Sequence, residues 1–111
     1  MARLPNSDQA ILDLRKIEEY CLNPLHPRGR HKARVFRDAL SVGRNDARWL
    51  REVLLVAARE NEATELAGDA LGRRWRIDVP VGRQNRNIVV RTIWIVRTGE
   101  DMPRFVTCWV L

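Results

Sequence analysis

The sequence predicts an α+β fold in which about three N-terminal helices pack on a C-terminal antiparallel sheet of three to four strands. Apolar residues recur at helical spacing through residues 10–60, whereas from residue 73 onward they alternate with a period of two. The helical part precedes the strand-forming part, which is the order typical of an α+β protein. A chain of 111 residues has room for one hydrophobic core, so we expect a single domain over residues 1–111.

The first predicted helix begins after Asp13, a residue type that caps helix N-termini, and its apolar positions continue to Cys21. The pair Asn23-Pro24 ends this helix, because a residue before proline avoids the helical conformation. The segment 25–29 should then be a loop that is rigid at its prolines and flexible at Gly29.

A second helix is predicted from about Arg30 to Leu40, with Gly43 as its terminator. The third helix should be capped by Asn45 or Asp46, and its apolar residues follow the i, i+3, i+4, i+7, i+8 pattern of a helix with one buried face. The acidic residues 60–69 that follow are expected to form a loop.

Three strands are predicted in the C-terminal part. Residues 73–81 alternate as in a strand with one buried face, residues 88–96 are apolar on both faces as in a central strand, and residues 105–110 form the last strand. The connecting segments 82–87 and 98–103 contain the glycine, asparagine and proline residues of turns. We therefore expect an antiparallel meander over about residues 73–111.

The aromatic and sulfur side chains indicate packing roles. Trp75 and Trp94 fall on apolar strand positions, so a base-stacking platform of exposed aromatic residues is not favoured. Cys21 and Cys108 lack metal-ligand spacing and should be packed thiols, and no cofactor or metal is predicted. No apolar run approaches the roughly 18 residues that span a bilayer, so we expect a cytoplasmic protein without membrane association.

Positive charge is concentrated in one fifth of the chain. The formal net charge is +6, and the segment from Arg28 to Arg48 holds seven basic residues against Asp38 and Asp46, a net of +5. Arginine side chains bind phosphate through two parallel hydrogen bonds, which favours an anionic partner. Arginine codons of a GC-rich genome and an ordinary solvated helix face are the plainer explanations.

The basic segment also holds groups that can transfer a proton. His31 and Lys32 are adjacent near the predicted helix start, and metal-free RNA cleavage needs a base, an acid and cations on the phosphate. Adjacent helical residues point about 100° apart, which opposes a shared target atom. The residues predicted to bind nucleic acid are Arg28 just before the helix, Arg30, Arg34 and Arg37 on the helix, and Arg76 and Arg104 on strands.

Two stretches of the chain resemble a bacterial domain of unknown function. The first, Asn23 to Phe36, follows the pattern N-P-x-H-P-x-G-x-H-K-A-R-V-F, and the second is the P-R-F-V-T tail from Pro103 to Thr107. Residues 4–6 and 90–95 are similar as well, so the likeness covers nearly the whole chain. Members of that family look like stand-alone genes beside small acidic partner genes, or like modules of polymorphic toxins and phage head proteins.

That resemblance implies a fold and a site. The order of helices and sheet is similar to the ribonuclease toxin fold shared by barnase, EndoU, colicin nucleases and RelE, in which a helical Lys or His faces strand-borne Arg and Thr residues. By this resemblance the catalytic residues would be His31, Lys32, Arg91, Thr92 and Thr107. Thr92 and Thr107 could instead be cross-strand neighbours that satisfy each other's hydroxyl groups.

The leading hypothesis is a toxin-type, metal-independent ribonuclease that acts on tRNA or mRNA and is neutralised by a small acidic antitoxin or immunity protein. The alternative is a non-catalytic module that pairs with an acidic protein or binds nucleic acid, such as a phage head accessory with affinity for DNA. The two separate on geometry: catalysis requires His31, Lys32, Arg91 and Thr92 to converge in one concave site.

Overall fold

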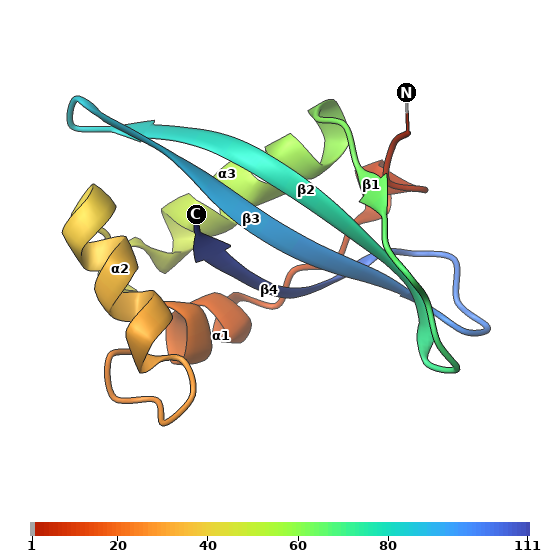
Figure 1. The fold of residues 1–111 in the computed structure, drawn as a ribbon, viewed down its shortest axis with the longest axis horizontal. Helices are drawn as coiled ribbons and strands as arrows, with labels where there is room; N and C mark the ends of the chain where they lie inside the picture. The colour runs from red at the N-terminus through yellow and green to blue at the C-terminus, as the bar shows by residue number, and fades with distance from the viewer. Residues whose placement is uncertain (1) are drawn as a thin grey trace.

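The computed structural model describes residues 2–111 and confirms the predicted fold class (Figure 1). The chain first forms the short helical turns η1 (Ser7–Gln9), α1 (Leu14–Lys16) and η2 (Ile17–Cys21), followed by α2 (Arg30–Leu40), η3 (Arg44–Asp46) and α3 (Ala47–Glu60). It then forms an antiparallel sheet in the order β1-β2-β3-β4, with strands Thr64–Glu65, Gly72–Arg83, Arg86–Arg97 and Arg104–Val110.

β2 and β3 are the longest strands and lie at the centre of the sheet. β2 and β3 pair over their whole length, from Gly72 opposite Arg97 to Arg83 opposite Arg86. Gln84 and Asn85 alone turn the chain, and both have the positive φ angles that a tight hairpin turn requires. The turn is therefore shorter than the predicted loop of residues 82–87.

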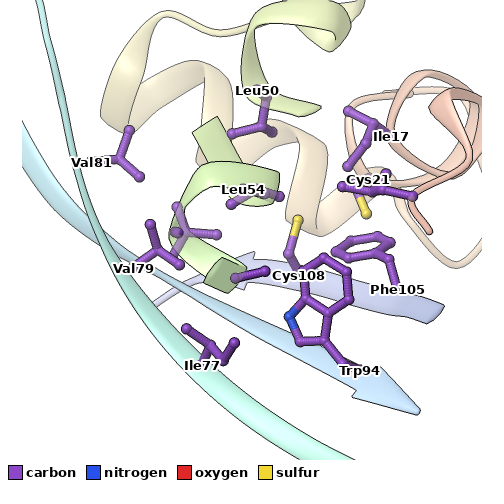
Figure 2. Close-up of a cluster of buried hydrophobic side chains, with 14 of the residues drawn as sticks. Ile17, Cys21, Leu50, Leu54, Ile77, Val79, Val81, Trp94, Phe105 and Cys108 are labelled. Carbon is purple, nitrogen blue, oxygen red and sulfur yellow. The ribbon is translucent and has the colours of Figure 1, made fainter. Parts of the chain in front are cut away.

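The helices cover one face of this sheet. The alternation predicted for β2 is confirmed, because Trp75, Ile77, Val79 and Val81 are all buried. α3 lies across that face, and Leu50 and Leu54 point from it toward the strands (Figure 2). On the other face of the sheet, β2 carries Arg74, Arg76 and Asp78, whereas β3 carries Arg91 together with the apolar residues Ile93 and Ile95.

The first helix begins as predicted but does not continue as a regular α-helix. The Asp13 side chain accepts a hydrogen bond from the backbone N–H of Arg15 and so caps the N-terminus of α1. The backbone then widens into a π-helical turn over Ile17–Cys21, which carries Ile17 and Cys21 into the core. This turn brings Tyr20 and Cys21 next to β4.

Two local predictions were wrong, and a third is confirmed only in position. α2 has the predicted bounds, but Ser41, with φ of 56°, ends it in place of Gly43. Asp46 is the N-cap residue of α3 as predicted, but its carboxylate accepts from the Gly43 N–H and makes no cap hydrogen bond to α3. Thr64–Glu65 was expected in a loop but forms the edge strand β1. Both residues are exposed, so the sequence shows no alternation of apolar and polar residues there.

Candidate functional site

The N-terminus of α2 is fixed by the loop that precedes it. The His26 Nδ1 atom accepts hydrogen bonds from the backbone N–H groups of Arg28 and Gly29, each at 3.0 Å. The His26 ring also packs edge-on against Tyr20, with centroids 4.7 Å apart. His26 is therefore a structural residue, and the loop it organises sets the position of α2.

Gly29 is not a flexible point of this loop, contrary to the prediction. A Cβ atom at Gly29 would lie 2.3 Å from the backbone oxygen of Tyr20, closer than any real contact. The absence of a side chain thus lets α2 approach η2 directly. The close approach places the first turn of α2 beside Tyr20 and β4.

The outer face of α2 is a basic surface, which we call the arginine face. Arg30, Arg34 and Arg37 recur at spacings of four and three residues and are all exposed, as is Arg28 just before the helix. None of the four forms an ion pair within residues 2–111. Their charge is therefore available to an external anion.

Lys32 points from the same helix toward β4. Its ammonium donates a hydrogen bond to the Thr107 hydroxyl at 3.3 Å. The same ammonium lies 5.5 Å from the centre of the Tyr20 ring and 5.0 Å from that of Trp109, within the range of cation–π attraction. The cation is thus held in one place by a hydroxyl and two aromatic rings.

α2 and the end of β4 lie near each other (Figure 1), and a pocket of about 380 Å³ opens between them. Its walls are formed by His31, Lys32, Val35, Trp109 and Val110. Most of this lining is apolar, and His31 and Lys32 are its two charged or titratable side chains. His31 and Lys32 point in different directions from the helix, as adjacent helical residues do, but both border this pocket.

The predicted strand arginines do not join the pocket as free cations. Arg91 makes a two-pronged ion pair with Asp78 at 2.9 and 3.0 Å, and Arg76 lies 3.9 Å from the same carboxylate. The Arg91 hydrogen bonds hold the pKa of Asp78 below its usual range. Arg104 is paired with Glu100 at 2.9 Å. Arg91 and Arg76 therefore share the one charge of Asp78, and Glu100 neutralises Arg104.

Thr92 is buried on the core face and takes no part in the pocket. Its hydroxyl donates to the Ile77 carbonyl at 2.7 Å and accepts from Trp94 Nε1 at 2.9 Å. Its opposite residue on β4 is Cys108, so the alternative of mutual Thr92–Thr107 bonding was also wrong. Of the five residues predicted as catalytic, Lys32 lines the pocket with His31 and bonds Thr107. Arg91 and Thr92 join neither contact.

The two cysteines lie together beneath this site. Both are buried free thiols, as predicted, and Figure 2 shows Cys21 and Cys108 in the same core cluster. Hydrogen bonds from Cys108, with smaller contributions from Thr107 and Lys32, lower the pKa of Cys21 to about 7. The pKa of Cys108 is raised because its proton is shared with Cys21 and its sulfur is buried.

Tyr20 and Trp109 were not singled out from the sequence. Trp109 lies two positions after Thr107, so strand alternation places both on the same side of β4, and this spacing could have drawn attention to it. Tyr20 offers no comparable pattern, because its position depends on the π-helical turn of η2.

The described residues, 2–111, contain neither a metal-binding cluster nor a helix long and apolar enough to cross a membrane. Within that range no three His, Cys, Asp or Glu side chains gather in a group that could hold a metal ion. Across the same residues, every helix is too short or too polar to cross a bilayer.

Comparison with known proteins gives a family without an assigned activity. The model of a family described as "Domain of unknown function (DUF6883)" matches residues 3–111. No curated protein and no solved structure matches the chain. Because the family model spans almost the entire sequence, the protein belongs to the DUF6883 family.

Proposed function

We propose that this protein is a metal-independent ribonuclease of the toxin type that cleaves tRNA or mRNA in the cytoplasm. The observation that carries the proposal is that His31 and Lys32 line one pocket, that Thr107 bonds Lys32, and that the unpaired arginine face lies on the same helix. Lys32 and the arginine face bind the phosphates, and His31 transfers the proton. A small acidic antitoxin or immunity protein would neutralise this activity by covering the same positive surface.

The reaction is an internal phosphoryl transfer. His31 accepts the proton of the ribose 2′-hydroxyl as that oxygen attacks phosphorus, the bond from phosphorus to the 5′ oxygen breaks, and the Lys32 ammonium donates a proton to the leaving oxygen. The Thr107 hydroxyl and two aromatic rings orient the ammonium. The products are a 2′,3′-cyclic phosphate and a 5′-hydroxyl end, and no oxidant or co-reactant is consumed.

The first test measures cleavage of tRNA and of a single-stranded RNA in the presence of EDTA. We expect cyclic-phosphate products from the wild-type protein and a rate lower by about 100-fold or more for His31→Gln and Lys32→Met, since a positioned acid or base contributes 10²–10⁴ in rate. Lys16→Met is the matched control. Lys16 is the other lysine of the chain, and its ammonium donates to the Phe105 carbonyl, away from the pocket.

Two outcomes would contradict the ribonuclease proposal. One is a wild-type protein that leaves every RNA intact, and the other is cleavage that Lys16→Met and Lys32→Met reduce equally. Cleavage of a 2′-deoxy substrate would also contradict the mechanism, because that substrate lacks the attacking hydroxyl.

A second candidate function is binding without catalysis, to nucleic acid or to an acidic protein. The observation that favours it is that Arg91 and Thr92 do not join His31 and Lys32. In that case the arginine face would serve only to bind an anionic partner. Pairwise substitution by alanine at Arg30 and Arg34 should weaken polyanion binding and flatten its salt dependence by about two counterions.

The matched control for this pair is alanine at Arg59 and Arg97. Both are exposed, and neither has an ion pair among the described residues. The two double variants carry the same net charge. Equal losses of affinity in a salt titration would mean that net charge, and not the arginine face, determines binding.

A further inference from the structure

Trp109 helps to orient the Lys32 ammonium in the mechanism proposed above, but that mechanism assigns no ligand to the apolar walls of the pocket beside it. Trp109 is half-buried on β4, opposite Arg91 of β3. The Lys32 ammonium lies 5.0 Å from the centre of its ring, and the ring forms one wall of the 380 Å³ pocket. A tryptophan that serves only the core would not line an open hollow.

The opposite walls of the pocket are also apolar and accessible. Val35 is 44% exposed although it lies on a helix whose other exposed positions are mostly charged, and Val110 adds a second aliphatic wall from β4. His31 and Lys32 stand at the same hollow, and the arginine face lies on the same helix. The result is an apolar slot with an aromatic wall, with Lys32 at the slot itself and the arginine face elsewhere on the same helix.

We propose that this pocket holds one unpaired nucleobase, stacked on the Trp109 indole, while the flanking phosphates bind Lys32 and the arginine face. This rests on the proposed function and names its substrate class as single-stranded RNA. A planar apolar group between anionic groups is the ligand that the slot complements, and aromatic stacking with a positive groove is how single strands are bound generally. A base within a duplex cannot enter, because its faces are covered by its neighbours.

The lining also determines how selective the pocket is. His31 and Lys32 are assigned to the phosphate and its proton transfer, and the two valines have no polar side-chain atoms. The Trp109 indole N–H lies in the plane of its ring, so it is directed away from the edge of a base stacked on that ring. The pocket should therefore accept all four bases, with purines favoured over pyrimidines by their larger stacking area.

Binding of a 2′-O-methyl RNA oligonucleotide tests the pocket separately from cleavage, because this probe lacks the attacking hydroxyl. Fluorescence anisotropy with the full-length protein should show Trp109→Ala weakening single-strand binding by about 5- to 150-fold, the range for one lost stacking partner. Trp109→Phe should retain most of the affinity. The same oligonucleotide in a duplex should bind more weakly, and Trp109→Ala should not affect it.

Trp49→Ala is the matched control, because Trp49 is also half-buried and also lies under a cation, with Arg83 at 4.7 Å from its ring. A second variant guards against unfolding of Trp109→Ala. Val35→Arg adds positive charge but fills the pocket, so it should weaken single-strand binding, whereas Val56→Arg, at an equally exposed position of α3, should preserve or strengthen it.

The outcomes separate the two proposals. Loss of binding only in the pocket variants supports the nucleobase pocket even if no RNA is cleaved. Equal effects of Trp109→Ala and Trp49→Ala, tighter binding by Val35→Arg, or equal dependence of duplex and single strand on Trp109 would each overturn it. So would a polyglutamate peptide that displaces the oligonucleotide and itself loses affinity with Trp109→Ala, because the pocket would then be a protein-docking site.

Discussion

Among residues 2–111, Thr92 is the buried polar side chain of the core, with 0% of its surface exposed. Its hydroxyl links the Ile77 carbonyl of β2 to the indole N–H of Trp94 on β3. A buried donor or acceptor that loses its partner costs free energy, because water cannot replace the lost hydrogen bond. Thr92 therefore stabilises the packing of Trp94 and acts as a structural residue.

Replacing Thr92 by valine preserves shape and removes the hydroxyl. We expect the free energy of unfolding to fall by about 1–3 kcal/mol, because Trp94 Nε1 would be buried without an acceptor. Urea denaturation measures the change, and Thr64→Val at an exposed position of β1 should stay within about 0.5 kcal/mol of wild type. An unchanged midpoint for Thr92→Val would mean that the indole finds another acceptor.

At the scale of elements, the position of α2 relative to η2 and β4 determines whether Lys32 meets Thr107. Gly29 allows the close approach to the Tyr20 backbone, and the His26 ring accepts hydrogen bonds from the N–H groups of Arg28 and Gly29, the two residues before the helix. Both residues lie in the loop before the helix. This loop therefore governs the geometry of the pocket although neither residue lines it.

Gly29→Ala should lower the free energy of unfolding by about 1–3 kcal/mol, because the new methyl group would overlap backbone atoms that cannot rotate away. Gly43→Ala is the matched control: nothing lies within 4 Å of its Cβ position, so stability should be unchanged or slightly higher. Thermal unfolding compares the two. Equal melting temperatures would show that α2 can shift away from η2 without loss.

At the scale of the whole molecule, ion pairs join elements that are distant in sequence. Asp46 accepts from the Gly43 N–H and pairs with Arg83 at 3.0 Å, which ties the start of α3 to the end of β2. These contacts hold the pKa of Asp46 below its usual value of 3.8, and Arg91 does the same for Asp78. Both carboxylates thus bind protons less readily in the folded state than in the unfolded state.

The sign of the pH dependence follows from that difference. The stabilisation is fully present above about pH 4 and is lost as the pH falls below 3.8 through the lowered pKa values of the folded state. Asp46→Asn should lower the unfolding free energy by about 1 kcal/mol at pH 7 and make the acid decline shallower. Denaturation between pH 2 and 7 checks this, with the exposed Asp8→Asn as the control. A parallel decline in both variants would contradict the assignment.

The sequence by itself determined the elements whose pattern repeats along the chain. The alternation from Trp75 to Val81 and the helical spacing before Glu60 both reflect burial on one face. The sequence shows this directly, because the buried positions hold apolar residue types. The arginine face of α2 was likewise predictable, because residues three and four apart share a helix surface. These features are local, and the structure confirms them.

Only the tertiary structure decided which charged and polar groups meet. Arg91 is a strand arginine in the sequence, but Asp78 of β2 stands opposite it and neutralises it. Thr92 and Thr107 are alike in sequence, yet one is buried and the other binds Lys32. Such pairings depend on the strand register, on which face of the sheet a side chain occupies, and on the close approach of α2 at Gly29. They join residues that are far apart in the chain, so they produce no repeating pattern in the sequence.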